Sequence, residues 1–403
     1  MKKNIILFTI LILLNIYVFG QGQWVTQNTG TSNYLTSVYF PSVDTGYTCD
    51  ITGHIFKTTN GGSNWSNVST LTTEFYCMHF INNDTGFIAG QKILKTNNGG
   101  ISWQEVFPDS GFSFSYIRML SMDTIVAVCW DGITNNKVFM SYNSGNTWNM
   151  IGAFQNPLTV SSVGCFINSK IGYVADGAGN VYKTLNGGSL WTSSSIGFND
   201  IVFSMFYTDI DTGFAVGYTT GILFYTNNGG ATWSQINTGF NNPLYSVYFT
   251  SHSIGYAVGG DGYNTGTVIK TNDGGNTWAL ATSTNLTFYC VHFPDANIGY
   301  ASGDNGSILK YTSATGTNDN NSEINNICVY PNPVNDYAII NIPDYFIKNE
   351  SILELSDLNG NLIKRYTLKQ NTIRLNVSSL SSGIYTIKVK DKDKFVIKKI
   401  VKI

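Results

Sequence analysis

The sequence predicts an all-β protein: a seven-bladed β-propeller closed by its N-terminal strand, followed by a small immunoglobulin-like β-sandwich. Two observations lead to this fold class. First, an eight-residue pattern, Ser/Thr-x-Asn/Asp-Gly-Gly-x-x-Trp, recurs along the first three quarters of the chain. Its period of about 40–45 residues is typical of a radial array of small sheets. Second, the composition changes after a polar stretch near residue 313, which separates a shorter second domain.

The repeated pattern, which we call the box, has the chemistry of a tight turn. Each of its six copies has an Asn or Asp, a Gly pair (Ser144 replaces the first Gly of the third copy) and a final Trp: Asn60, Asn98, Asn143, Asn186, Asn228, Asp273 and Trp65, Trp103, Trp148, Trp191, Trp233, Trp278. We expect the Asn or Asp side chain to accept backbone N–H bonds one or two residues onward, and the glycines to supply positive φ angles. The Trp should begin the next strand, cover the turn and donate its indole N–H to a carbonyl.

The box resembles the Asp-box (BNR) repeat of sialidases, sortilin and xyloglucanases, although Asn holds the Asp position in all copies but one. It is more similar to the propeller of the photosystem II assembly and stability factor family, whose blades contain Thr-x-Asn/Asp-Gly-Gly-x-x-Trp. This resemblance implies that the box is a structural hairpin lock away from the ligand. We therefore expect no metal and no cofactor there.

Seven inner strands are expected, and each ends at an aromatic or apolar residue: Phe40, Phe80, Met119, Phe166, Tyr207, Phe249 and Phe293. The seventh repeat stops near Thr312 without a box. The missing piece is at the other end, because the segment from Trp24 to Gly30 matches the segment from Trp233 to Gly239. The N-terminal segment should therefore supply the outer strand of the last blade and close the ring. Six or eight blades would require one of these units to be misassigned.

The loops opposite the boxes collect carboxylates and aromatic residues. Our candidate ligand face contains Asp50, Trp130, Asp131, Asp176, Asp261 and Asp304. Loops on a rigid scaffold are common binding sites, so this face could take a glycan or a protein. Ordinary solvated loops are the alternative. On the inner strands, we expect His79, Arg118 and His292 to be packed and hydrogen-bonded, with a role in lining a central channel as the alternative.

Composition and residue counts exclude several function classes. A net charge of −2 predicts no nucleic-acid partner, and the six cysteines have neither disulfide-framework nor zinc spacing. They are expected to be free thiols, with Cys49–Cys77 and Cys129–Cys165 as the alternative bridges. Between the N-terminal segment and residue 320 the only arginine is Arg118, which excludes the three-arginine carboxylate clamp of a sialidase.

Enzymatic activity is not expected, although one alternative stays open. Hydrolysis like that of xyloglucanases needs two carboxylates about 5–10 Å apart. Asp131, Asp176 and Asp261 are the candidates for such a pair. The photosystem family also has a basic patch that engages its client, whereas residues 21–315 have eight Lys and one Arg against sixteen acids. That difference argues against a photosystem role.

The N-terminus resembles a secretion signal. Lys2 and Lys3 precede an apolar run from Ile5 to Phe19, so residues 1–20 are predicted to be a cleaved signal peptide, with a retained anchor as the alternative. Residues 21–312 would then form the propeller, and residues 313–326 a polar linker. No later segment is long and apolar enough to cross a bilayer.

The last residues, 327–403, contain short alternating strands and four ordered motifs. They begin with Tyr330, Pro331, Asn332 and Pro333, continue with an Asp-x-x-Gly turn at Asp357 and a Leu-Ser-Ser-Gly-Ile-Tyr segment containing Gly383 and Tyr385, and end in a basic strand with Lys398 and Lys399. This region closely resembles the type A sorting domain of type IX secretion; an ordinary immunoglobulin-like binding domain is the alternative. The resemblance implies the outer-membrane translocon as partner and a secreted or cell-surface location.

These observations predict a secreted, non-enzymatic binding or adhesion module for a glycan or protein. A polysaccharide hydrolase and an envelope assembly factor similar to the photosystem II family are the alternatives.

Overall fold

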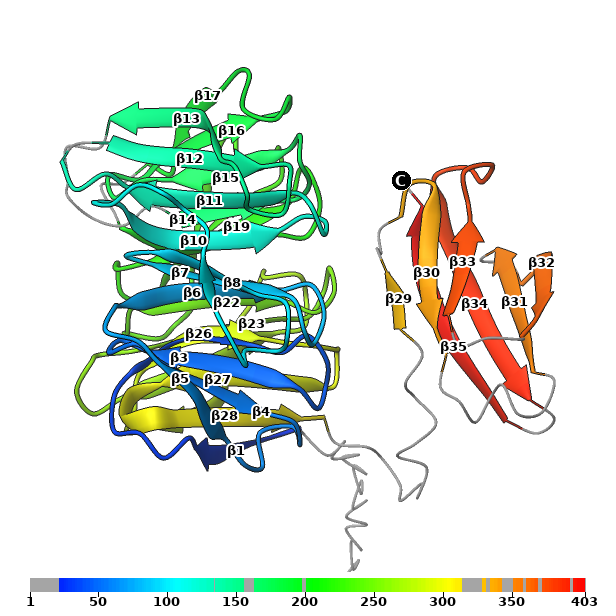
Figure 1. Cartoon of the computed structure of the whole chain (residues 1–403), viewed down its shortest axis with the longest axis horizontal. Helices are drawn as coiled ribbons and strands as arrows, with labels where there is room; N and C mark the ends of the chain where they lie inside the picture. Colours follow the sequence, from blue (N-terminus) through cyan, green and yellow to red (C-terminus); the bar gives the residue numbers. More distant parts are fainter. Residues whose placement is uncertain are drawn as a thin grey trace, which may run out of the picture. The chain divides into compact units, whose positions relative to one another are not determined.

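The computed structural model describes residues 22–133, 135–155, 163–197, 201–313, 328–330, 334–342, 351–357, 360–368, 372–391 and 394–402. The predicted signal peptide and most of the predicted linker lie outside these residues. The chain divides into two compact units, with the boundary between Ala314 and Thr315 (Figure 1). We call them the ring unit and the tail unit and describe each separately.

Among the described residues, the ring unit contains seven antiparallel four-stranded sheets. Sheets 1 to 3 are β2 (Leu35–Tyr39), β3 (Gly46–Asp50), β4 (His54–Thr58), β5 (Ser66–Thr70); β6 (Phe75–Phe80), β7 (Gly86–Gly90), β8 (Ile93–Thr96), β9 (Gln104–Glu105); and β10 (Ser113–Met119), β11 (Ile125–Trp130), β12 (Asn135–Ser141), β13 (Asn149–Gln155). Sheets 4 and 5 are β14 (Val163–Phe166), β15 (Gly172–Ala175), β16 (Asn180–Thr184), β17 (Thr192–Ser195); and β18 (Val202–Tyr207), β19 (Gly213–Gly217), β20 (Ile222–Thr226), β21 (Ser234–Asn237). Sheets 6 and 7 are β22 (Leu244–Phe249), β23 (Gly255–Gly260), β24 (Gly266–Thr271), β25 (Ala279–Thr284); and β26 (Phe288–His292), β27 (Ile298–Gly303), β28 (Ser307–Thr312), β1 (Gln23–Asn28), with the short 3₁₀ turn η1 (Asp304–Gly306) before β28.

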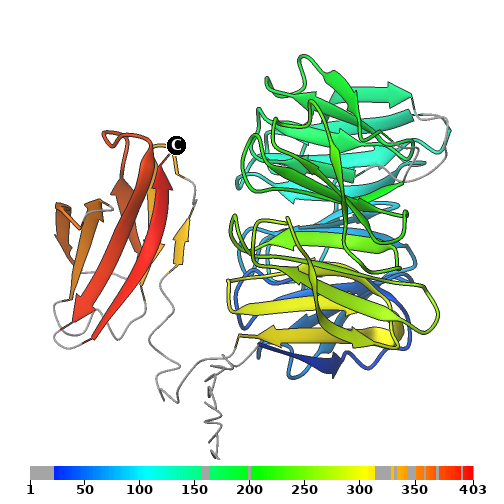
Figure 2. The same cartoon turned by 180° about the vertical axis from the view of Figure 1, so that it is seen from behind.

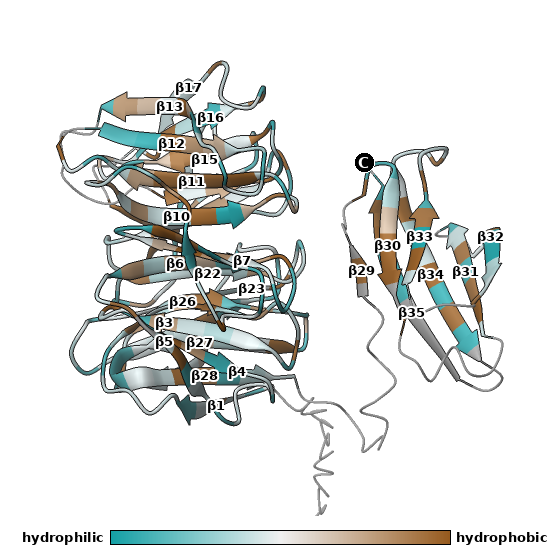
Figure 3. Cartoon of the chain, viewed as in Figure 1, coloured by the Kyte–Doolittle hydropathy of each residue, from teal (hydrophilic) through white to brown (hydrophobic). Residues whose placement is uncertain are grey.

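The first strands of the seven sheets lie beside one another in chain order, and β26 of sheet 7 contacts β2 of sheet 1 (Figures 1 and 2). Second strands such as β3, β7, β19 and β23 are buried along their whole length. Figure 3 shows the hydrophobic character of β11, which is almost entirely buried. Both faces of these sheets are therefore covered by neighbouring sheets, which explains why their strands lack hydrophobic alternation.

A ring-on-ring contact joins neighbouring sheets. The aromatic residue that ends or directly follows a first strand stacks on an aromatic residue from the second strand of the preceding sheet: Phe40 on Tyr300 at 3.5 Å between centroids, Phe80 on Tyr47 at 3.9 Å and Tyr207 on Tyr173 at 3.7 Å. A glycine lies under each ring, because a Cβ added at Gly172 would be 2.2 Å from the Phe166 ring. In sheet 3, Met119 replaces the aromatic residue and Ile125 replaces the glycine.

The boxes form turns at the ends of the third strands, with a different bonding pattern from the one we predicted. The Asn60 Oδ1 accepts from the backbone N–H of Asn64, four residues onward rather than one or two, at 2.9 Å. The Thr58 hydroxyl fills the centre of the turn, because it donates to Asn60 Oδ1 at 2.9 Å and accepts from the Gly62 N–H at 3.0 Å. All three bonds recur in the last box. The Thr271 hydroxyl donates to Asp273 Oδ1 and accepts from the Gly275 N–H, and Asp273 Oδ1 accepts from the Thr277 N–H. The leading Ser or Thr is therefore required by the turn itself.

The box tryptophans cover their turns, but their indole N–H groups differ. Trp148 and Trp191 donate to carbonyls of the preceding sheet, Val106 and Ile151, at 2.9 and 2.8 Å, and Trp278 donates to Gly275 of its own box at 3.1 Å. The Nε1 atoms of Trp65, Trp103 and Trp233 have no acceptor among the described residues. The predicted carbonyl contact thus holds for half of the boxes.

Lysines that precede the boxes connect one sheet to the next. Lys57 Nζ donates to the carbonyl of Gly99 in the following box at 2.9 Å, and Lys310 Nζ donates to Gly61 at 2.8 Å. Five lysines also lie over the aromatic ring of their own second strand, with Nζ 5.4–5.8 Å from the ring centroid: Lys57, Lys95, Lys183, Lys270 and Lys310. Three lysines, Lys57, Lys95 and Lys310, thus donate a hydrogen bond to the neighbouring sheet.

The N-terminal strand lies in the last sheet. β1 pairs with β28 so that Trp24 faces Tyr311 and Gln23 faces Thr312. In Figure 1, β1 in dark blue runs beside β28 in yellow. The Trp24 ring packs edge-on against Phe293 at 6.1 Å. The segment predicted to complete the seventh repeat thus pairs with it.

The tail unit has two sheets around one core. One contains β29 (Cys328–Tyr330), β30 (Tyr337–Asn341) and β33 (Thr372–Asn376); the other contains β32 (Leu362–Thr367), β31 (Ile352–Asp357), β34 (Gly383–Asp391) and β35 (Lys394–Lys402). Buried side chains from both sheets, such as Ile340, Leu375, Leu353 and Ile387, form the core. The tail unit thus consists of short strands, as the alternation of residues 327–403 predicted.

Candidate functional site

Each first strand begins on one face of the ring unit and ends on the face that has the boxes; we call the former the mouth face. Within the described residues, six first strands have a β-bulge near their start. The extra residues at these bulges are Thr36, Tyr76, Ser115, Phe203, Tyr245 and Tyr289. Because a bulge re-aims the side chain of its extra residue, it can present that side chain at the mouth instead of within the sheet-to-sheet packing.

Three of these bulge residues and the exposed Tyr34 form a continuous aromatic arc, which we call the mouth arc. Tyr34 contacts Tyr289 at 6.2 Å between ring centroids, Tyr289 contacts Tyr245 at 5.2 Å, and Tyr245 contacts Phe203 at 5.0 Å. The arc spans sheets 1, 7, 6 and 5. Tyr34 is 53% exposed, and the other three rings are half-buried.

The sequence prediction missed the mouth arc, although a signal for it exists. An aromatic residue stands four positions before the aromatic residue that ends or directly follows four first strands (Phe80, Tyr207, Phe249 and Phe293), at Tyr76, Phe203, Tyr245 and Tyr289. In a regular strand this position would share a face with the strand's last residue. Only the bulge, which cannot be read from residue types, separates these rings from the packed surface.

Three of the predicted ligand-face carboxylates point into the protein. Asp50 and Asp176 have no exposed surface, and the Asp131 side chain is 8% exposed. Each one caps the turn between a second and a third strand: Asp176 Oδ1 accepts from the N–H groups of Ala178 and Asn180 at 2.9 Å. Their oxygens are thus already bonded within the fold.

The environment of Asp50 illustrates this capping role. Burial alone would raise the pKa of Asp50. Hydrogen bonds from the Asn33 amide, the His54 N–H and the hydroxyl and N–H of Thr52 outweigh burial and lower the pKa overall. His54 Nδ1 also lies 2.9 Å from Asp50 Oδ2. This carboxylate is held ionised for the turn.

Asp261 and Asp304 lie closer to solvent. Asp261 is exposed, and the backbone N–H groups of Thr265, Tyr263 and Asn264 lower its pKa. Asp304 Oδ1 accepts from the Tyr289 hydroxyl at 2.8 Å, and this bond orients one ring of the mouth arc. On sheet 2, Glu74 accepts from the hydroxyl of Tyr76. Two mouth tyrosines are thus anchored by carboxylates.

Trp130 lies beside a buried amide. It pairs with Asn136 across β11 and β12, and Asn136 is completely buried. The Trp130 Nε1 and both amide atoms of Asn136 have no partner in the part of the chain that the structure describes. Trp130 is half-buried at the mouth end of sheet 3.

Below the mouth, one side chain from each first strand points towards the axis of the ring. We call this set the axial cluster, and its members hold equivalent register positions opposite the second strands: Tyr39, His79, Arg118, Cys165, Phe206, Tyr248 and His292. Tyr39 contacts both His292 at 4.2 Å and His79 at 4.7 Å, and Tyr248 contacts His292 at 5.5 Å. Two of the three residues singled out in the sequence, His79 and His292, therefore contact the same tyrosine, and Arg118 holds the equivalent position on β10.

The two histidines of the axial cluster are packed and hydrogen-bonded, as predicted. His79 Nδ1 accepts from the Met119 N–H of the next sheet at 3.4 Å, and His292 Nδ1 accepts from the Phe40 N–H at 3.3 Å. Burial lowers the pKa of His292 to about 3. Burial, Arg118 and His292 together lower the pKa of His79. Both rings are therefore neutral and connect neighbouring sheets.

Cysteines and metals offer no site in the described residues. Cys49, Cys77, Cys129, Cys165 and Cys290 are free, so neither alternative bridge forms. Burial raises the pKa of each of these thiols, which keeps them unreactive. No group of three or more His, Cys, Asp or Glu side chains in the described ranges is placed to hold a metal ion. No helix there has the length and apolar character needed to span a membrane.

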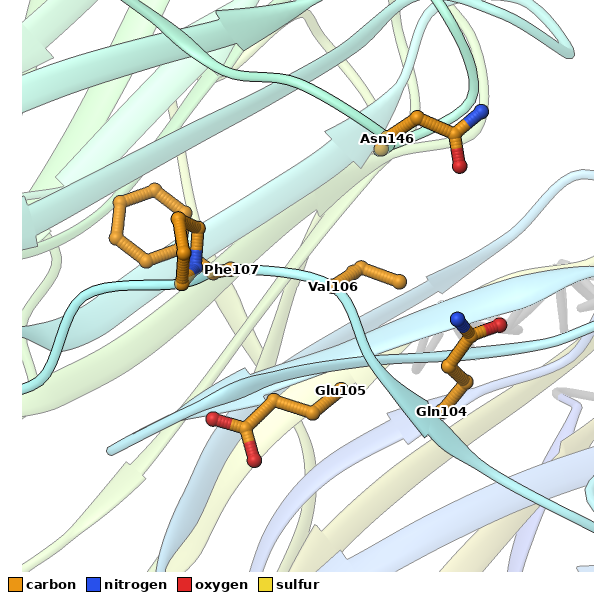
Figure 4. Close-up of a pocket in the computed structure, with 7 residues that line it drawn as sticks. Gln104, Glu105, Val106, Phe107 and Asn146 are labelled. Carbon is orange, nitrogen blue, oxygen red and sulfur yellow. The ribbon is translucent and has the colours of Figure 1, made fainter.

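A surface hollow of about 440 Å³ lies at the outer edge of sheets 2 and 3, away from the mouth. One side of the hollow is formed by the strand β9 and the two residues after it, Val106 and Phe107. Asn146 of the next box faces them (Figure 4). It is open and contains none of the predicted ligand residues.

The sorting motifs of the tail unit converge on the last strand, β35. Gly383 pairs with Lys402, and Val334, directly after the Tyr330–Pro333 motif, bridges the same lysine. Asp357 of the predicted turn pairs with Tyr385, which pairs with Ile400. Lys398 and Lys399 lie on this edge strand, where they pair with Ile387 and Thr386 of β34. Pro331, Asn332 and Pro333 lie outside the described residues.

Comparisons with known proteins agree with this architecture. Residues 328–403 match the family model of the secretion system C-terminal sorting domain. Residues 71–221 match the model of the second domain of the CATSPER subunit beta protein. No curated protein matches the sequence significantly.

Among solved structures, the chain is similar to YCF48 bound to a D1 peptide and to YCF48 from Cyanidioschyzon merolae, each with a TM-score of 0.60 and 16% identity over 72% of this chain and 97% and 98% of theirs. It is also similar to the WD40 β-propeller domain of Doa1, with a TM-score of 0.60 and 11% identity over 74% of this chain and 98% of that one. Identities this low show the fold alone. The ring unit therefore has a β-propeller fold, and residues 328–403 are a secretion system C-terminal sorting domain.

Proposed function

We propose that the ring unit is a closed seven-bladed propeller, exported by its tail, that acts as a non-enzymatic glycan-binding module. The observation that supports binding most strongly is the mouth arc of Tyr34, Tyr289, Tyr245 and Phe203. Tyrosine rings combine an apolar face with a hydroxyl, which suits both the C–H faces and the hydroxyl groups of a sugar. The carboxylates of Asp304 and Asp261 supply acceptors nearby, as in sites with a few polar groups among aromatic walls.

The hydrolase alternative has less support. A carboxylate pair must reach the scissile bond, whereas Asp176 is buried and Asp131 is nearly so. Asp261 is the one exposed member of the proposed set, and it caps its own turn. We therefore keep binding as the function and treat hydrolysis as an outcome of the test.

An envelope assembly factor is the third candidate, motivated by the fold shared with YCF48. Recognition through a basic patch would need free cations. In this chain Lys57, Lys95 and Lys310 donate to carbonyls of neighbouring boxes. Such a role would therefore have to use a different surface.

For export, we propose that residues 1–20 direct the chain to the periplasm and that the type IX translocon recognises the tail unit, an immunoglobulin-like sandwich, at β35. The convergence of Gly383, Val334 and Asp357 around β35 and its partner strand supports that surface. Residues 313–326 would serve as the linker. The protein would end on the outer cell surface or in the medium.

Two experiments test these proposals. The full chain is screened against a glycan array and assayed for reducing-sugar release on soluble polysaccharides. We expect binding without sugar release. Sugar release that Asp176→Asn or Asp131→Asn abolishes would show that the protein is a hydrolase. Binding only to protein baits would show that the ligand is a protein and not a glycan. Separately, deletion of residues 327–403 should retain the ring unit in the periplasm, and normal export of that truncation would contradict the sorting role.

A further inference from the structure

The four rings of the mouth arc do not share a plane. The interplanar angle is 61° between Tyr34 and Tyr289, 65° between Tyr289 and Tyr245, and 32° between Tyr245 and Phe203. A flat surface can lie against only one of two rings that are tilted in this way. The steps of 5.0–6.2 Å between centroids are each about as long as one sugar unit of an extended chain. The arc is therefore shaped for a ligand that turns from one ring to the next.

The orientation of the central ring, Tyr289, is fixed by hydrogen bonds and by its neighbours. Its hydroxyl donates to Asp304 Oδ1 at 2.8 Å, and Asp304 Oδ2 accepts from the Thr287 N–H at 3.0 Å. These bonds fix the long axis of the ring. The edge contacts with Tyr34 on one side and Tyr245 on the other limit its rotation about that axis. The ring therefore cannot turn to match a flat surface without losing these contacts.

The same group of hydrogen bonds places a second carboxylate beside the arc. The Gly262 N–H donates to the Thr287 hydroxyl at 3.0 Å, which joins the turn between β23 and β24 to the start of sheet 7. Asp261 directly precedes Gly262 in this turn, and its side chain is exposed. It caps the turn by accepting three backbone N–H bonds of 2.9–3.0 Å. The carboxylates of Asp261 and Asp304 thus both lie at the centre of the arc.

The mouth end of the sheets that form the arc has no cation to balance these carboxylates. In the described residues of sheets 1, 5, 6 and 7, the lysines and arginines are Lys57, Lys270 and Lys310. Lys57 and Lys310 donate to carbonyls of neighbouring boxes, and Lys270 is the next-to-last residue of β24, which runs into the last box. His54, at the mouth end of sheet 1, is paired with Asp50. This part of the mouth face therefore presents negative charge, which repels an acidic ligand.

From these observations we infer that the ligand of the mouth arc is a single, uncharged polysaccharide chain, and neither a crystalline polysaccharide surface nor an acidic polysaccharide. The inference rests on the glycan-binding role proposed above and names the class of glycan. A single chain can twist so that successive sugar faces meet successive tilted rings, whereas the sugars on a crystal face lie in one plane. Sugar hydroxyls donate to the carboxylates of Asp261 and Asp304, whereas a uronic acid chain would place like charges against them.

The test offers the full chain three forms of one glucan. Hydroxyethyl cellulose is soluble and uncharged, carboxymethyl cellulose is soluble and acidic, and microcrystalline cellulose is a flat-faced solid. Galactomannan with polymannuronate, and galactan with polygalacturonate, are neutral and acidic pairs built from two other sugars. Affinity electrophoresis measures binding to the soluble chains, and sedimentation measures binding to the solid. We expect at least one neutral chain to bind at least about tenfold more tightly than its acidic partner, and the solid to bind the wild type no better than it binds Tyr289→Ala.

A pair of variants tests the contribution of charge. Asp261→Asn and Asp273→Asn each remove one exposed carboxylate, but Asp273 lies in the last box, where the other five boxes have Asn. At low ionic strength, Asp261→Asn should lower the preference for the neutral over the acidic chain by about twofold or more. Asp273→Asn is the matched control and should leave this preference unchanged.

The outcomes separate this inference from the proposed function. Equal affinity for the neutral and acidic partners, or binding to the solid that Tyr289→Ala abolishes, would overturn the inference and leave the glycan-binding role intact. An equal effect of Asp261→Asn and Asp273→Asn on the preference would overturn it as well. Binding to none of these polysaccharides would contradict the proposed function itself, and the inference with it.

Discussion

The Trp24 ring packs edge-on against Phe293, with an interplanar angle of 89° and 6.1 Å between centroids. In sheet 1, the box residue Trp65 packs on Phe40 in nearly the same way, at 88° and 5.8 Å. Two residues of different sequence context, one near the chain start and one in a box, thus occupy equivalent places. Trp24 also lies 5.2 Å from Tyr311, its partner across β1 and β28.

This equivalence predicts that Trp24→Ala destabilises the ring unit as much as Trp65→Ala does. Both side chains are half-buried, so we expect each variant to lose about 2–3 kcal/mol of unfolding free energy. Urea denaturation followed by tryptophan fluorescence measures both. A Trp24→Ala variant as stable as the wild type, beside a weakened Trp65→Ala, would mean that β1 contributes little to closure.

The close approach of the Phe166 ring to Gly172 predicts that a side chain at position 172 strongly lowers the stability of the ring unit. An added methyl group would overlap the Phe166 ring, so Gly172→Ala should cost about 1–3 kcal/mol. In sheet 3 the natural pair is Ile125 with Met119, so Phe166→Met should restore part of the loss. A double-mutant cycle by urea denaturation measures this coupling between positions 172 and 166. Additive effects of the two substitutions would show that the Phe166 side chain is not the reason for a glycine at position 172.

The lysine contact between sheets predicts a stability effect for a residue that sequence alone places on the surface. Lys57→Met keeps the aliphatic chain but removes the bond to the Gly99 carbonyl and the charge over Tyr47. We expect a loss of about 1–2 kcal/mol. Lys170→Met, which removes an exposed amine, is the matched control and should stay within about 0.5 kcal/mol of the wild type. Equal urea midpoints for the two variants would show that the contact of Lys57 with the next sheet does not stabilise the ring unit.

The buried His292 predicts a pH dependence. Its pKa is about 3 in the folded protein and near 6.5 in an unfolded chain, so unfolding takes up a proton between these values. The contribution of the neutral His292 ring to the unfolding free energy is therefore complete above pH 6.5, and it is lost as the pH falls towards 3. His292→Asn should reduce the drop in unfolding free energy between pH 7 and pH 4.5 by about 2 kcal/mol, measured by urea titrations at both values. His252→Asn, at an exposed site, is the control; an unchanged pH slope for His292→Asn would contradict the assignment.

Local patterns predicted the fold well. The boxes, the glycines and the match between Trp24 and Trp233 are short-range signals that mark turns and strand ends, so the pairing of the N-terminal segment with the last repeat could be predicted. The tail strands followed from their alternation. Turn chemistry is local, and so it is visible in sequence.

The site depends on features that sequence hides. Asp50, Asp131 and Asp176 look like ligand residues because carboxylates in loops are usually solvated, yet here they cap turns and face inward. The mouth arc depends on β-bulges, and the axial cluster depends on seven strands meeting at one level. Both require the ring to be assembled first.

The most direct test of the account is the binding of the full chain to immobilised polysaccharides, such as chitin, cellulose, xylan and alginate, by wild type and by two alanine variants. Tyr289→Ala removes the centre of the mouth arc, whereas Tyr142→Ala removes an exposed tyrosine of the third box, on the opposite face. Loss of an aromatic contact should weaken binding by about tenfold or more. The account predicts that Tyr289→Ala loses this affinity while Tyr142→Ala retains it; equal affinities in the two variants would contradict it.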